Sequence, residues 1–98
     1  MHARIATFQH DDAEAVDKMV EEIRGDADSG PPPGLEDAKG FLLLVDRQNS
    51  KSVGIIFFDS EEALKRGDEV LNKMTPDAGS RARRTSVEFY EVPIQQMA

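Results

Sequence analysis

The chain has neither cysteine nor tryptophan among its 98 residues. Without cysteine it can form no disulfide and no thiolate metal site, and thiol catalysis is excluded as well. A reducing cell interior suits such a chain, so we expect a cytoplasmic protein. No apolar run reaches the roughly 18 residues of a transmembrane helix. No basic region followed by an apolar stretch opens the sequence, so we expect neither membrane insertion nor secretion.

Basic side chains are scarce as well. Lysine and arginine number 12 against 19 aspartates and glutamates, which gives a net charge of -7. Nucleic-acid binding needs cations to neutralise phosphates, so we expect no such partner. The cluster Arg81, Arg83 and Arg84 is more simply interpreted as charge balance than as a phosphate or acid site. Length and composition predict one globular domain over residues 1–98.

Hydrophobic periodicity predicts six elements in the order βαββαβ. Strands are predicted at 3–9, 40–46, 52–59 and 84–92, one helix at 12–24, and a second helix from about residue 60 to residue 74. Asp11 and Glu14 have the spacing of a capping box at the start of the first helix, and Gly25 is its expected stop. Ser60 or Asp59 is expected to cap the second helix.

Two connections have distinct compositions. Residues 25–39 hold three consecutive prolines, which forbid helix and favour a stiff extended segment. We expect a covering surface loop there, mobile apart from an anchor at Leu35, in preference to a loop that carries a site. Asn49 is expected to take left-handed backbone geometry in the hairpin turn at 47–51.

This order predicts an α+β fold of the ferredoxin-like type, a four-stranded antiparallel sheet with two helices on one face. The second strand is apolar on both sides: Phe41, Leu43 and Val45 point one way, and Leu42 and Leu44 the other. Each uncovered large side chain forfeits roughly 1.5–3 kcal/mol of burial. A second copy packed sheet to sheet would cover them, so we expect a homodimer.

Alternation along the first and last strands predicts the facing of their charged residues. Arg4 and Glu88 are expected to be neighbours on the face away from the helices. Tyr90 shares that face with Glu88 and is expected to serve the sheet interface. The histidines, His2 and His10, have no evident partners for a metal or a catalytic proton, so we expect surface histidines and no metal site.

Three stretches of the sequence resemble a known family: the opening MHARI at 1–5, the GFLLLVDR segment at 40–47, and the FDSEEAL joint at 58–64. They resemble the dimeric α/β-barrel superfamily and, within it, bacterial domains of the antibiotic-biosynthesis-monooxygenase type. The resemblance implies a homodimer whose two sheets form a shared barrel. It also implies a ligand pocket between sheet and helices in each subunit.

The same resemblance bears on catalysis. Active members, including the haem-degrading branch, commonly carry a tryptophan at the end of the third strand, a histidine on the second helix and an asparagine on the first strand. The corresponding positions here hold Phe58, Gly67, and Ala6 or Thr7. Because these positions depart from the family's pattern, the resemblance implies no haem ligand here, and we expect no cofactor.

Gly67 interrupts the buried stripe of the second helix, where a glycine costs about 1 kcal/mol relative to alanine. It allows either close packing of helix on sheet or space for a ligand above Phe58. In the second case Ile56, Leu64 and Val70 join Phe58 and Gly67 as the lining of an apolar pocket.

These features predict a small homodimeric protein that binds an apolar or aromatic ligand between sheet and helices, without clear catalytic residues. The alternative is a cofactor-independent monooxygenase acting on a quinone-like or polycyclic substrate, which the family resemblance alone supports. A third possibility is an interaction module whose pocket is filled by its own side chains, and a pocket volume separates it from the others.

Overall fold

The computed structural model describes residues 1–27, 35–73 and 82–96. Six elements follow one another in the predicted βαββαβ order. They are β1 (His2–His10), α1 (Ala13–Ala27), β2 (Ala38–Asp46), β3 (Lys51–Phe58), α2 (Glu61–Lys73) and β4 (Ala82–Glu91). None of the helices in these described ranges is long and apolar enough to cross a membrane.

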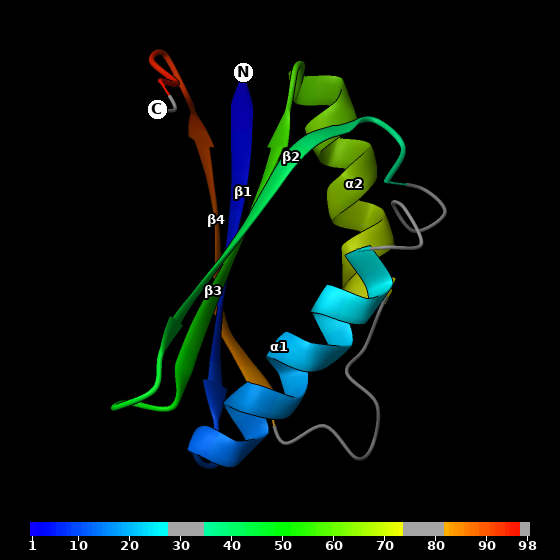
Figure 1. The fold of residues 1–98 in the computed structure, drawn as a ribbon. Helices are drawn as coiled ribbons and strands as arrows, with labels where there is room; N and C mark the ends of the chain where they lie inside the picture. Colours follow the sequence, from blue (N-terminus) through cyan, green and yellow to red (C-terminus); the bar gives the residue numbers. More distant parts are fainter. Residues whose placement is uncertain (28–34, 74–81, 97–98) are drawn as a thin grey trace.

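The four strands form one antiparallel sheet in the order β2-β3-β1-β4. Both helices lie on the same side of this sheet (Figure 1). The predicted ferredoxin-like fold is therefore confirmed. The strands at the two edges are β2 and β4, and the central pair is β3 and β1.

The ends of α1 differ from the prediction. Asp12, not Asp11, caps the helix, because its Oδ1 accepts a hydrogen bond of 2.8 Å from the backbone N–H of Ala15. The expected stop at Gly25 is wrong, since the helix continues through it to Ala27. A single glycine costs a helix about 1 kcal/mol but does not terminate it.

The cap of α2 and the hairpin turn lie where they were predicted, but the left-handed residue of the turn is the next one along the chain. The Ser60 Oγ accepts from the N–H of Ala63 at 3.1 Å. In the turn after β2, Ser50 has the positive φ of 53°, not Asn49. Asn49 instead donates to the Asp46 carboxylate from its backbone N (3.2 Å) and from its Nδ2 (2.7 Å). These bonds fix Asn49 in the turn, and the left-handed geometry falls on the next residue.

The core lies between α2 and the sheet. Phe58, Ala63 and Leu64 form its buried cluster, and Ala38 and Ile56 pack against it. Phe58 is fully buried at the end of β3. Small residues on the inner side of α2 allow the helix to approach this ring closely.

Leu35 anchors the end of the proline-rich connection as predicted, since only 5% of its surface is exposed. The loop predicted at 25–39 is too long at both ends, because α1 continues to Ala27 and β2 begins at Ala38. Its prolines lie in the range 28–34, outside the described residues, as does Arg81.

The predicted facing of Arg4 is wrong. Arg4 lies beneath α2 with 4% of its surface exposed. Its Nε donates to Asp68 Oδ1 at 2.8 Å, and its Nη2 donates to Asn72 Oδ1 at 3.4 Å. Arg4 pairs with Phe89 across the strands, whereas Ile5 pairs with Glu88 on the opposite side. A charged residue can be buried here because α2 supplies its hydrogen-bond partners.

The face of the sheet away from the helices, hereafter the uncovered face, is largely apolar. Cross-strand partners share a face, and the register places one set of large side chains there. This set is Ile5, Leu42, Leu44, Val53, Ile55, Phe57 and Tyr90. Leu44 and Tyr90 are each 50% exposed, and the Tyr90 hydroxyl donates to Glu88 Oε2 at 2.5 Å. The prediction that β2 is apolar on both faces is confirmed.

Candidate functional site

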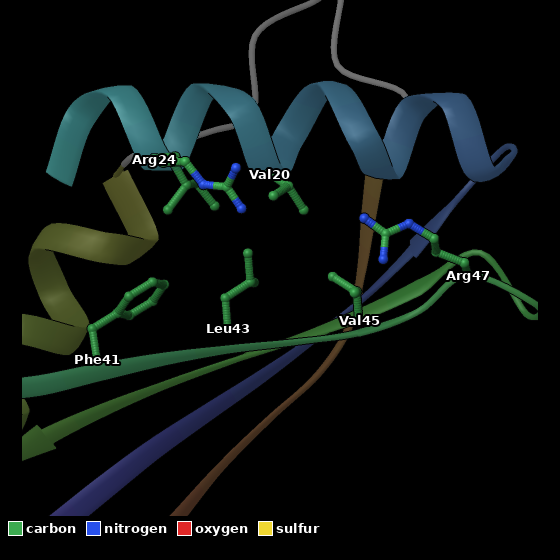
Figure 2. A pocket seen from close by; sticks show the side chains of 7 residues that line it. Val20, Arg24, Phe41, Leu43, Val45 and Arg47 are labelled. Atoms are coloured by element: carbon green, nitrogen blue, oxygen red, sulfur yellow. The ribbon is translucent and has the colours of Figure 1, made fainter.

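Among the residues that the structure describes, an opening lies between α1 and β2, a cleft of about 440 Å³. Near its N-terminal end α1 is held on the sheet by Val16, which is fully buried. One turn later Val20 is only partly buried and faces Leu43 of β2 across the cleft (Figure 2). The helix and the edge strand therefore form two walls without filling the space between them.

Two sequence periods build this cleft. On α1 the lining residues are spaced three and four apart, which places them on one helix face. On β2 they alternate, which places them on the helix-covered face of the strand. The full lining is Val20, Ile23 and Arg24 from α1, Phe41, Leu43 and Val45 from β2, and Arg47 from the turn. Five of these seven side chains are apolar.

The two polar lining residues are both arginines. Figure 2 shows their guanidinium groups directed toward the space between α1 and β2, one from each end of the cleft. The Arg47 Nε donates to Asp17 Oδ1 at 2.9 Å, and both side chains are more than half exposed. Arg24 makes no hydrogen bond or ion pair to any residue that the structure describes. The cleft is thus apolar inside and cationic at its ends.

Four of the five residues predicted to line a pocket belong to the core beneath α2. Phe58 and Leu64 are in its buried cluster, Ile56 packs against that cluster, and Gly67 lies against the Phe58 ring. A Cβ atom added at Gly67 would lie 2.7 Å from Cε1 of Phe58 and closer still to its Cζ, so the ring fills the space that the glycine leaves. The open space expected above Phe58 is therefore not present among the described residues. Ligand binding at Ile56, Leu64 and Val70 stays a prediction. At Gly67 the alternative prediction, close packing of the helix on the sheet, is the one that fits.

The histidines are not alike. His10 was predicted at the surface and is instead 5% exposed, with its Nε2 2.8 Å from the Ser52 Oγ. Ser52 in turn lies 3.6 Å from the Sδ of Met19 on α1. Burial lowers the pKa of His10, while the charge of Asp11 acts in the opposite direction. This cluster joins the end of β1 to β3 and contacts α1 through Met19, and none of its members lines the cleft.

Sequence comparison finds no match for the chain, either among protein-family models or among curated proteins. Solved structures do match. A mutant of MhuD with two manganese protoporphyrin IX molecules per active site has a TM-score of 0.72 at 16% identity, with 100% of each chain covered. The haem degrader MhuD from Mycobacterium tuberculosis, with two haems in its active site, has a TM-score of 0.69 at 19% identity. That match covers 99% of this chain and 100% of the other.

This chain shares the ferredoxin-like fold of MhuD. At these identities the likeness shows the fold alone. The fold is the one implied by the resemblance to antibiotic-biosynthesis-monooxygenase-type domains.

The residues present here do not fit a haem iron bound from α2. The family resemblance assigns Gly67 to the position of the imidazole of haem-degrading members, and Phe58 fills the space beside it. Of the two histidines, His10 is bonded to Ser52 and His2 begins β1, so neither lines the cleft. The opening between α1 and β2 is lined by apolar side chains and two arginines, without a histidine. It was missed from the sequence, although the alternation of Phe41, Leu43 and Val45 had already marked one of its walls.

Proposed function

We propose that this protein binds a small apolar or aromatic molecule in the cleft between α1 and β2, and that it does so as a homodimer. The observation that carries the proposal is the cleft itself. Its volume of about 440 Å³ is within the range of roughly 300–1,000 Å³ typical of small-molecule sites.

The lining supports an apolar ligand. Phe41 is 48% exposed on an edge strand, so a large aromatic ring is left without complete packing. A flat molecule placed against it would remove apolar surface from water, at about 25 cal/mol for each Å². The other lining groups are aliphatic side chains and guanidinium groups, which support binding rather than proton transfer.

The structural neighbours also support this type of ligand. Both MhuD structures hold flat porphyrin macrocycles in their active sites, two in each. A fold of this size can therefore open enough to accept large planar molecules. For this chain we propose the ligand class without the iron chemistry, because no described residue of the cleft is a histidine.

The uncovered face supports the homodimer. Its centre carries three rows of apolar side chains, and Leu44 and Tyr90 remain half-exposed in the single chain. An apolar patch of this kind on an isolated monomer usually marks an interaction site. In a dimer with a two-fold axis, the apolar patches of the two copies would face each other. A specific interface of this kind would bury more than about 1,000 Å² in total.

Two adjacent residues of β2 separate the parts of this proposal, because Leu43 faces the cleft and Leu44 the uncovered face. We expect Leu43→Glu to abolish binding of the neutral dye N-phenylnaphthylamine and to leave a dimer. Leu44→Glu would place two carboxylates in the dimer interface, so we expect a monomer by light scattering. Circular dichroism checks that both variants fold.

Either part of the proposal can fail on its own. A wild-type protein that does not enhance the fluorescence of N-phenylnaphthylamine would overturn the binding site. A monomer mass for the wild type at micromolar concentration would overturn the dimer.

A further inference from the structure

We infer that the ligand of this cleft carries an acidic group, and that Arg24 is the residue that binds it. This inference rests on the proposed function, because it names the chemical class of the ligand for the same cleft. The acid would be a carboxylate, sulfonate or phosphate at one end of an otherwise apolar molecule.

The first argument is the sign of the charge. The chain as a whole is acidic, with a net charge of -7. The cleft reverses this balance, since its lining includes two arginines and neither an aspartate nor a glutamate. A neutral aromatic molecule would gain only cation–π contacts from two cations at the ends of its site. An anionic group would gain charge-assisted hydrogen bonds from them.

The second argument separates the two arginines. Arg47 already donates its Nε to Asp17 at 2.9 Å, so its charge is partly neutralised and its position is fixed. Arg24 has no such partner among the residues that the structure describes, although its guanidinium group is directed toward the cleft (Figure 2). A planar guanidinium group binds a carboxylate through two parallel hydrogen bonds. Arg24 is therefore the principal anion-binding residue and Arg47 a secondary one.

Arg24 also has a purely structural explanation, which the test must separate. It lies in the last turn of α1, where a cation interacts favourably with the helix dipole. That role would change the melting temperature when the charge is removed. It would not change the preference of the cleft for an anionic over a neutral ligand.

Two dyes of almost the same shape provide the test. Anilinonaphthalene sulfonate and N-phenylnaphthylamine share one aromatic skeleton, and only the first carries an anionic group. For Arg24→Gln we expect the dissociation constant of the sulfonate dye to rise about tenfold and that of the neutral dye to change by less than about twofold. For Arg47→Gln we expect a smaller rise, about threefold, for the sulfonate dye alone. Arg24→Lys keeps the charge and should recover part of the lost affinity.

Arg66→Gln is the matched control. Arg66 lies on α2, pairs with Asp37 at 2.9 Å and does not line the cleft, so its loss changes the net charge equally without touching the site. We expect both dyes to bind this variant as they bind the wild type. Loss of both dyes in Leu43→Glu locates them in the cleft.

The outcomes distinguish this inference from the proposed function. If neither dye binds the wild type, the proposed function fails. If both dyes bind and Arg24→Gln weakens them equally or not at all, the acidic ligand is excluded and the apolar site remains. If Arg66→Gln weakens the sulfonate dye as much as Arg24→Gln does, the effect is one of overall charge and the inference is overturned.

Discussion

The two helices on the same face of the sheet differ in how closely they pack against it. Against α2 the sheet is closed, with Phe58, Ala63, Leu64 and Gly67 all buried. Against α1 the fully buried contact is Val16, and farther along the helix a cleft opens over β2. Small residues on α2 let the helix sit directly on the Phe58 ring. The larger side chains that face each other from α1 and β2 keep those two elements apart, so one helix builds the core and the other bounds a cleft.

Loss of an ion pair should lower the free energy of unfolding much more at α2 than at α1, and this is the largest difference that we expect between the two helices. Beneath α2 the Arg4 side chain is 5% exposed and bonded to Asp68, so Asp68→Ala leaves a buried guanidinium with one weaker partner. Removal of one member of a buried pair typically costs about 3–5 kcal/mol, and we expect about 3 because Asp68 is itself 25% exposed.

Asp17→Ala is the matched variant on α1. Its pair with Arg47 is more than half exposed on both sides, and such pairs contribute less than about 1 kcal/mol. Urea unfolding of both variants measures the two free energies. Equal losses would show that α2 is no more tightly integrated than α1.

The helix glycines should respond in opposite directions. At Gly67 a Cβ would overlap the ring of Phe58, so we expect Gly67→Ala to destabilise the protein by about 1–3 kcal/mol through overpacking. At Gly25 a Cβ meets no atom within 4 Å, so Gly25→Ala should stabilise α1 by up to about 1 kcal/mol.

A second substitution identifies the cause of the Gly67 effect. In the background of Phe58→Leu, which removes the aromatic ring, Gly67→Ala should cost less than it does in the wild type. Thermal unfolding of the four proteins of this cycle gives the coupling between the two positions. An unchanged cost of Gly67→Ala would mean that some contact other than the ring closes α2 onto the sheet.

The fold was predictable because the information for it is local. Each strand and helix has its own apolar period, and the order of six elements then restricts the topology to very few arrangements. The apolar character of both sides of β2 was also visible in five consecutive residues. The error of one position at the cap of α1 arose because two adjacent aspartates are both good caps. The left-handed geometry at Ser50 goes against propensity, which favours Asn49, and follows from the bonds of Asn49 to Asp46.

The facing of Arg4 and the place of the cleft were not predictable in the same way. Arg4 is buried because of Asp68, which is 64 residues away in the sequence, and alternation alone favours burial of its apolar neighbour. The cleft depends on how closely the side chains of α1 and β2 pack together, which neither segment determines alone. Gly67 was informative in the sequence, but its two interpretations differ only by the position of the Phe58 ring.

The smallest expected effect concerns the buried histidine at the end of β1. His10 is buried against Ser52, and burial lowers its pKa below the usual 6.5. In the unfolded chain the same imidazole takes up a proton near pH 6.5, whereas in the folded protein it resists protonation until the pH is lower. The unfolded state therefore binds more protons in that window, and the stability that depends on His10 decreases as the pH falls below 6.5.

His10→Gln isolates this contribution, because glutamine can still donate a hydrogen bond to Ser52 but does not titrate. We expect the free energy of unfolding of the wild type to fall relative to the variant as the pH is lowered from about 8 to about 5. Above about pH 7 the difference between the two proteins should be constant, since the imidazole is then neutral in both states. His2 and all carboxylates are common to both proteins and cancel in the comparison. A difference that stays constant over the whole range would mean that His10 accepts its proton equally well in the folded state, and that His10 is more open to water than its 5% exposure indicates.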